Sequence, residues 1–264
     1  MKEPIRILSD LHLGHSASRI KKVEMLRPLI EGAGTVVFNG DTWQELSHEG
    51  RQRGAVLLKE LDQMCQEMEV ETIYLPGNHD PSIGSRHALE LSNGKVVIFH
   101  GDTVYPEVSP WSQHFIAMRG EVMSLIERHD LMNMTFDERA HLAQQVVRLM
   151  TPHKGRRKSV FRYLTDTLWP PSRLWTLLTL PLHYQGATAR FSHQYFPNAE
   201  VIITGHFHLR SIVKRDGKCF INTGAHMLGC HSQVVEIMND QIFCMNIVHY
   251  RRGVIGFCSA RKVS

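Results

Sequence analysis

The stretch "LPGNHDPS" (residues 75–82) ends an apolar, strand-like run in a proline-glycine turn and then presents Asn78, His79 and Asp80 in a row. The turn itself needs only Gly77 and Asn78. The question is therefore what the additional polar side chains hold. The endings of the other strand-like runs provide the answer.

Four other strand-like runs end in the same kinds of side chain. In chain order the five endings are "ILSDLHLGH" (7–15), "VVFNGD" (36–41), "YLPGNHD" (74–80), "VIFHGD" (97–102) and "IITGHFH" (202–208). Ligands of open α/β sheets bind at the carboxyl ends of the strands. Turn chemistry does not explain five endings that are this rich in Asp, Asn and His. We therefore predict a metal site at one edge of an α/β sheet.

The spacing within two of these endings indicates how the ligands converge. In an extended segment, alternate side chains point to the same side, which favours convergence of Asp10 with His12 and of His206 with His208. Carboxylate, amide and imidazole ligands together suit borderline divalent ions such as manganese, iron, cobalt or zinc. No thiol joins the set.

Composition sets the broad class of the protein. The 264 residues are 42% hydrophobic and 21% charged, which is typical of a soluble globular protein. The net charge of +4 permits anionic partners without requiring them. Five cysteines without a CxxC pair indicate reduced thiols in a cytoplasmic protein. The sequence shows neither an apolar signal core nor an apolar run of membrane-spanning length, so we expect no membrane span.

The order of elements predicts an α/β core with an insertion. Apolar residues at three- and four-residue spacing predict a helix over 56–68, and a second helix is expected over 20–31. The C-terminal part is β-rich, with a hairpin at Asp216-Gly217 and a further turn at Asn239-Asp240. We expect a core of residues 1–104 and 198–264 and a largely helical insertion over 105–197.

The motifs D-x-H, GD, GNHD, H-G and GHxH, in that order, resemble the calcineurin-like metallophosphoesterase superfamily. The resemblance covers roughly residues 5–102 and 199–225. It implies a double-β-sandwich α/β fold flanked by helices, with two metal ions. Asp10, His12, Asp41 and His208 would hold the first ion. Asp41, Asn78, His100 and His206 would hold the second, so that Asp41 bridges the two.

The same resemblance implies a reaction. His79 would be the acid or transition-state residue above the two ions, and Asp80 would orient it. Two divalent ions, of which we favour Mn²⁺ over Fe, Zn or Co, can share a hydroxide that attacks phosphorus in line. His79 would protonate the leaving group. The protein is thus predicted to be a hydrolase of phosphoesters or phosphoanhydrides.

The insertion contains a basic cluster, "HKGRRK" (153–158), and an apolar stretch, "LWPPSRLWTLLTLPL" (168–182). These residues form either a separate small core or a lid or membrane-surface patch, because tryptophan and leucine beside basic residues favour the interface. A helical insert after the H-G-D strand resembles the UDP-2,3-diacylglucosamine pyrophosphatase branch of the superfamily. Many members of that branch carry Arg where this chain has His79.

Several functions therefore remain open at this point. The substrate is expected to be a phosphorylated small molecule or a lipid-linked nucleotide, with peripheral membrane contact through 153–182. A small phosphodiesterase is an alternative. A nuclease ranks lower because no aromatic and basic stripe tracks a strand. A catalytically silent scaffold on the same fold is the remaining alternative, and the oligomeric state is open.

Overall fold

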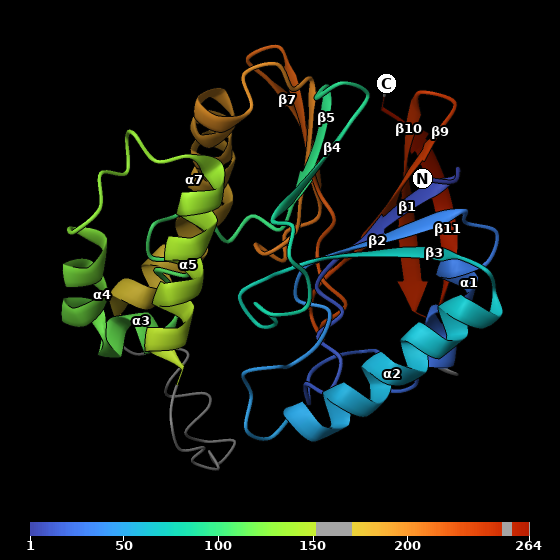
Figure 1. Cartoon of the computed structure of the whole chain (residues 1–264), viewed down its shortest axis with the longest axis horizontal. Coiled ribbons are helices and arrows are strands. Elements are labelled where there is room, and N and C mark those ends of the chain that lie inside the picture. Colours follow the sequence, from blue (N-terminus) through green and yellow to red (C-terminus); the bar gives the residue numbers. More distant parts are fainter. Residues whose placement is uncertain (152–170, 250–254, 264) are drawn as a thin grey trace. The chain divides into compact units, whose positions relative to one another are not determined.

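The chain folds into two compact units, which are described separately (Figure 1). The structure is a computed structural model that describes residues 1–151, 171–249 and 255–263. The first unit contains residues 1–101 and 198–264, and the second contains residues 102–197. All the strands belong to the first unit among the described residues, and all the predicted ligands belong to it as well.

A six-stranded mixed sheet forms one layer of the first unit. Its strands are, in spatial order, β11 (Ile255–Lys262), β10 (Gln241–His249), β9 (Gln233–Met238), β1 (Ile5–Leu8), β2 (Thr35–Asn39) and β3 (Glu71–Leu75). β1, β2 and β3 pair in parallel, whereas β9, β10 and β11 are antiparallel to their neighbours. The parallel strands therefore end at one edge of the sheet, as the sequence predicts.

A five-stranded mixed sheet forms the second layer. Its strands are, in order, β4 (Ala88–Leu91), β5 (Val96–Phe99), β6 (Val201–Thr204), β8 (Lys218–Asn222) and β7 (Ser211–Arg215). β5, β6 and β8 pair in parallel. The hairpin of β7 and β8 turns at Asp216-Gly217 with φ of 52° and 77°, which confirms the predicted turn.

The two sheets share a buried apolar core. Ile7, Val37 and Ile203 belong to this core, together with alternate residues of the neighbouring strands. The residues between them, such as Phe38, face the opposite side and pack with Leu61 of a helix. This period of two separates the core between the sheets from the core under the helices. The arrangement confirms the predicted α/β fold with two sheets flanked by helices.

The helices of the first unit agree only in part with the prediction. The apolar face predicted over 56–68 belongs to α2 (Arg51–Glu67), so that helix is confirmed. The helix expected over 20–31 is instead a 3-10 turn, η1 (Val23–Leu26), followed by the single turn α1 (Arg27–Ile30). Pro28 lies in the first turn of α1, where a missing N–H is tolerated. The proline thus divides the predicted helix into two short segments.

The described part of the second unit is helical. Its helices are α3 (Gln113–Ala117), α4 (Arg119–Ile126), α5 (Phe136–Met150) and α7 (Pro171–Tyr195). Thr135 and Glu138 form a capping box at the start of α5. The ring of Phe136 lies 4.9 Å from that of Phe196, so the start of α5 packs beside the end of α7.

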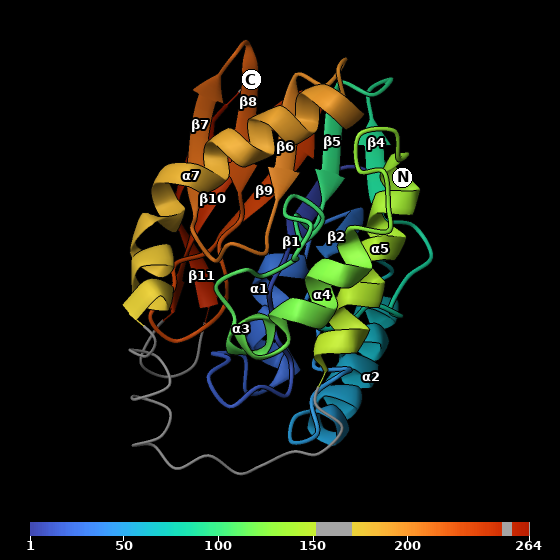
Figure 2. The ribbon, with the colours of Figure 1, turned by 90° about the vertical axis from the view of Figure 1, so that its left-hand side faces the viewer.

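Helix α7 changes direction part of the way along its length in Figure 2. Pro181 lies inside this helix, where a proline removes a backbone hydrogen bond and bends the helix. Within the described part of the chain, no helix combines the length and apolarity needed to cross a bilayer. The basic cluster 153–158 lies outside the described residues.

Candidate metal centre

The predicted ligands lie in loops beyond the strand ends, and most of them have a left-handed backbone. Asp10 and His12 follow β1, Asp41 follows β2, and His206 and His208 follow β6. All five have φ between 49° and 65°. This conformation costs a residue with a side chain of order 1–3 kcal/mol, and it persists where the surroundings require it.

The way in which the paired ligands converge differs from the prediction. We expected strand alternation to bring Asp10 to the side of His12, and likewise His206 to the side of His208. The strands end earlier, at Leu8 for the first pair. Left-handed turns therefore aim these side chains, and the D-x-H and H-x-H spacing reflects loop geometry instead of an extended segment.

The first cluster comprises Asp10, His12, Asp41 and His208, whose ligand atoms all lie within 4.8 Å of one another. Nε2 of His208 is 3.1 Å from Nε2 of His12 and 3.2 Å from Oδ1 of Asp10. Two imidazole nitrogens at this separation share at most one proton. The two nitrogens and the carboxylates thus face a common space, which a cation fits when it displaces that proton.

The second cluster comprises Asp41, His100 and His206. Nε2 of His100 is 3.4 Å from Oδ2 of Asp41. The other ring nitrogen of His100, Nδ1, is 2.9 Å from the carbonyl oxygen of Asn39 and donates to it, which turns Nε2 toward Asp41. Oδ1 of Asn78 is 2.8 Å from Nδ1 of His206, so Asn78 adjoins this cluster. Asp41 is common to both clusters.

The donor set fits divalent metal ions. Carboxylate, imidazole and amide donors suit borderline ions, and no cysteine belongs to either cluster of described residues. The backbone is shaped for the approach of the ligands, since a Cβ at Gly40 would collide with the ring of His100 and one at Gly77 with the carboxylate of Asp41. The structure thus brings the seven predicted ligands together. The ion that each one holds stays a prediction.

Both carboxylates of the clusters are ionised at neutral pH. Burial disfavours the charged form of Asp10, but a hydrogen bond to His208 and the charge of His100 outweigh it and hold the pKa below its ordinary value. Burial also opposes the charge of Asp41, yet His100 and His79 hold its pKa well below the ordinary value. Asp10 and Asp41 therefore carry the negative charge that a bound cation needs.

Two of the histidines have opposite pKa shifts. Burial lowers the pKa of His12 well below its ordinary value, and Asp41 opposes this only in part. Burial also disfavours the charged form of His208, but hydrogen bonds to Asp10 and Cys230 raise its pKa to about 10. His12 is thus neutral, as a ligand must be, whereas His208 carries a proton that a metal ion has to displace.

His79, the predicted acid, borders both clusters. Its backbone N–H donates to Oδ1 of Asp41 over 2.8 Å. Its ring nitrogen Nε2 is 3.9 Å from Oδ2 of Asp41, and 42% of the side chain is exposed. The other ring nitrogen, Nδ1, is 3.2 Å from Oε1 of Gln44. The sequence did not indicate Gln44, because an amide in a polar loop carries no distinguishing pattern.

Asp80 has contacts of a different kind from those predicted. The residue is fully buried. Its carboxylate accepts hydrogen bonds of 2.7–3.2 Å from four backbone N–H groups, those of Asp41, Thr42, Trp43 and Gly77. Burial, with the nearby charge of Asp41, raises the pKa of Asp80 to about 8. Asp80 thus supports the loop that carries Asp41, and any effect on the ring of His79 passes through the backbone.

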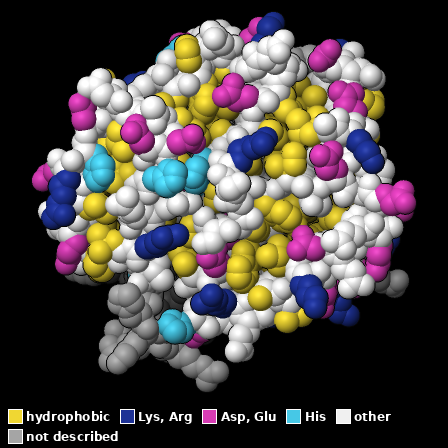
Figure 3. All heavy atoms as spheres, viewed as in Figure 1, with side chains coloured by type: hydrophobic (Ala, Val, Ile, Leu, Met, Phe, Trp, Pro, Cys, Tyr) yellow, Lys and Arg dark blue, Asp and Glu magenta, His cyan; other side chains and the backbone are white. Residues whose placement is uncertain are grey.

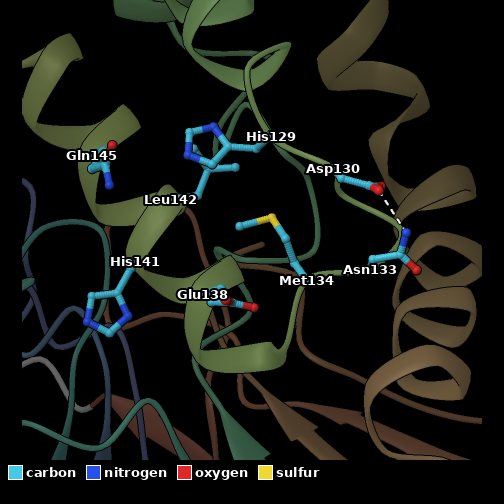
Figure 4. A pocket seen from close by; sticks show the side chains of 8 residues that line it. All are labelled: His129, Asp130, Asn133, Met134, Glu138, His141, Leu142 and Gln145. Atoms are coloured by element: carbon cyan, nitrogen blue, oxygen red, sulfur yellow. Dashed lines mark hydrogen bonds between the residues drawn. The ribbon is translucent and has the colours of Figure 1, made fainter.

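The second unit contains a pocket of about 410 Å³. Figure 4 shows the side chains that line it, which are His129, Asp130, Asn133, Met134, Glu138, His141, Leu142 and Gln145. The two acidic side chains among them already make local hydrogen bonds. Glu138 belongs to the capping box of α5, and Asp130 accepts a 2.7 Å hydrogen bond from Asn133. Figure 3 shows histidines at the surface on the face viewed in Figure 1. None of the predicted site residues lines this pocket.

A model of the calcineurin-like phosphoesterase family matches residues 3–210 of the chain. This match includes the endings of β1, β2, β3, β5 and β6, and hence all seven predicted ligands. No curated protein matches the chain.

Several solved structures are similar to the chain at low identity. A single mutant of Vps29 from Entamoeba histolytica is 13% identical with a TM-score of 0.48, and the match covers 98% of this chain and 99% of that one. A predicted phosphoesterase from Streptococcus pneumoniae is 14% identical, with a TM-score of 0.41 and coverage of 100% and 99%. A cold-active protein-tyrosine phosphatase of a psychrophilic Shewanella is 13% identical, with a TM-score of 0.39 and coverage of 97% and 80%.

Proposed function

Because the chain belongs to the calcineurin-like phosphoesterase family, we propose that it is a metal-dependent phosphohydrolase that cleaves a phosphoester or phosphoanhydride. The observation that carries this proposal is the position of Asp41, whose carboxylate belongs to both ligand clusters. Bound divalent ions would polarise the phosphoryl group and lower the pKa of water toward neutrality. Mn²⁺ is the ion we favour, with Fe, Zn and Co as alternatives.

His79 supplies the proton in this proposal. Its Nε2 lies on the side of Asp41, at 3.9 Å, and the ring is exposed enough to meet a substrate. A proton on Nε2 would pass to the leaving oxygen as the bond between that oxygen and phosphorus breaks. General acid catalysis of this kind contributes roughly 100- to 10,000-fold to a rate.

Hydrolysis of bis(p-nitrophenyl) phosphate with Mn²⁺ tests the reaction class. We expect the wild type to hydrolyse this diester. Toward an alkyl phosphodiester, whose leaving oxygen needs a proton, His79→Ala should lose roughly 100-fold or more in kcat with unchanged metal content. His193→Ala, which removes an exposed histidine of α7, is the matched control. A metal-loaded wild type that is inert toward phosphodiesters and pyrophosphates would contradict the proposal and favour the silent scaffold.

For the substrate, we propose a nucleotide-linked lipid pyrophosphate similar to UDP-diacylglucosamine. Its support is the insertion, in which Trp175 and Leu182 of α7 are 70% and 75% exposed. They are seven residues apart, which is about two helical turns, although Pro181 lies between them. Exposed apolar side chains that follow the basic cluster 153–158 along the sequence suit a membrane interface.

Two measurements separate this substrate from the others. The first compares turnover of the lipid-linked pyrophosphate with that of a small cyclic phosphodiester and of single-stranded RNA. The second measures co-sedimentation with vesicles of phosphatidylglycerol and phosphatidylcholine. The double variant Trp175→Gln/Leu182→Gln should bind several-fold more weakly, whereas Met132→Gln, also exposed, should bind as the wild type does. A wild type that does not bind vesicles would contradict the membrane contact.

A further inference from the structure

Gln44 lies between the loop that carries His12 and the loop that carries His79. Its backbone N–H donates to the carbonyl oxygen of Leu13 over 3.1 Å, and the N–H of the next residue, Glu45, donates to the carbonyl oxygen of His79 over 3.1 Å. The residue is 2% exposed. The backbone thus holds the side chain of Gln44 in a buried position between the two loops.

The side-chain amide of Gln44 contacts both imidazoles. One end is 2.9 Å from Nδ1 of His12, and the other is 3.2 Å from Nδ1 of His79. The centroids of the two rings are 4.8 Å apart, and the ring planes are nearly perpendicular, at 87°. The two ends of an amide have nearly the same shape, so both orientations satisfy these distances. The orientations differ in chemistry, because only the oxygen accepts and only the nitrogen donates.

The proposed role of His12 as a ligand selects one orientation. With Nε2 of Gln44 toward His12, as in the structure, Nδ1 of His12 accepts and its Nε2 carries the proton. A neutral imidazole that offers its Nε2 lone pair to a metal ion carries the proton on Nδ1 and needs an acceptor there. The amide oxygen must then face His12, which places the amide nitrogen against His79.

This orientation decides where the proton of His79 lies. The amide N–H of Gln44 donates to Nδ1 of His79, so the neutral ring carries its proton on Nε2. That atom is the one that lies 3.9 Å from Asp41, on the side of the clusters. We infer that Gln44 is a positioning residue whose amide links His12 to His79 and holds the two rings in opposite tautomers. The inference rests on the proposed function, because it requires His12 as a ligand and His79 as the acid.

The variant Gln44→Leu tests both ends of this link. Mn²⁺ affinity, measured by calorimetry without any substrate, should fall by roughly 10- to 100-fold because Nδ1 of His12 loses its acceptor. At saturating Mn²⁺, kcat should fall further for an alkyl ester than for a nitrophenyl ester, since nitrophenolate leaves without a proton. Gln63→Leu on the exposed side of α2 is the matched control. Gln44→Asn, too short to reach both rings, repeats the test if the leucine variant does not fold.

The variant Gln44→Glu separates the two contacts. A carboxylate still accepts from His12, so Mn²⁺ affinity should stay within a few-fold of the wild type. The same carboxylate has no N–H to donate to Nδ1 of His79, so kcat for the alkyl ester should fall as it does in Gln44→Leu.

Two outcomes distinguish failure of this inference from failure of the proposed function. Equal Mn²⁺ affinity and equal leaving-group dependence in Gln44→Leu and Gln63→Leu would overturn the role of Gln44 and leave the phosphohydrolase intact. A wild type that binds none of Mn²⁺, Fe²⁺, Zn²⁺ and Co²⁺ would overturn the proposed function and, with it, the inference.

Discussion

Asp41 is the residue on which the candidate metal centre depends most. Its carboxylate belongs to both clusters, and nearby histidines hold its pKa well below the ordinary value although it is buried. Asp41→Asn keeps the size and removes the charge, so we expect both ions to bind at least about 10- to 100-fold more weakly. Metal titration monitors this, with the exposed Asp216→Asn as the control. If Asp41→Asn retained one ion at full affinity, Asp41 would not bridge the two ions.

His208 predicts a pH dependence of metal binding. Its pKa is raised from 6.5 to about 10, so the stability contributed by its proton is fully present below pH 6.5 and is lost as the pH rises toward 10. A metal ion must displace this proton, so affinity should rise with pH over the same window, by up to about tenfold per unit for one proton. Calorimetry at several pH values between about 6.5 and 8.5 measures how steeply the metal affinity rises with pH. An affinity independent of pH would show that His208 is already neutral.

At the scale of residues, the sequence predicts ligand types better than their geometry. Asp10 and His208 were recognisable because their types, order and neighbouring glycines form a pattern. Their left-handed φ of 51° and 57° was not, since the sequence of a loop does not specify the backbone of residues other than glycine. Gln44 escaped prediction for a related reason, because its role depends on two rings that only the fold brings together.

Helix α2 approaches the ligand loops closely at a glycine. A Cβ at Gly54 would lie 2.7 Å from the carbonyl oxygen of Leu13 and 3.3 Å from the ring of Trp43. Backbone cannot yield as a flexible side chain does, so Gly54→Ala should destabilise the protein by about 1–3 kcal/mol. The same substitution at an open helical position stabilises by about 1 kcal/mol.

Gly120 of α4 is the matched control for this prediction. No atom lies within 4 Å of a Cβ placed there, so Gly120→Ala should stabilise its helix by roughly 0.5–1 kcal/mol. Urea unfolding of both variants measures the change in the free energy of unfolding, which should be a decrease for Gly54→Ala and an increase for Gly120→Ala. Stabilisation by both substitutions would contradict the close approach of α2 to the loop after β1.

At the scale of elements, strong local patterns predict well and short segments do not. The apolar face of α2 and the turn at Asp216-Gly217 each specify their element within a few residues. The four-residue strand β4 was not predicted, although Asn93-Gly94 with φ of 56° and 81° marks the turn before β5. Single turns such as α1 depend on tertiary packing more than on their own sequence.

At the scale of the whole molecule, the candidate centre joins two sheets. Asp10 and Asp41 follow strands of the six-stranded sheet, whereas His100 and His206 follow strands of the five-stranded sheet. The apolar core holds the sheets together between the strands. At the edge formed by the strand ends, carboxylates and imidazole rings face one another instead. Bound cations would therefore stabilise the contact between the sheets at the place where apolar packing ends.

Removal of metal should destabilise the first unit far more than the second. An ion present at about 100 times its Kd contributes about 2.7 kcal/mol to the folded state, so a chelator should lower Tm and speed amide exchange in β1, β2, β5 and β6. Helices α5 and α7 contain none of the ligands, so their exchange should stay unchanged. Hydrogen exchange with and without chelator measures the protection of both sets of elements. Asp41→Asn should gain far less protection than the wild type from the same concentration of ion. Equal loss of protection in α5 and α7 would show that the ions stabilise more than the junction of the two sheets.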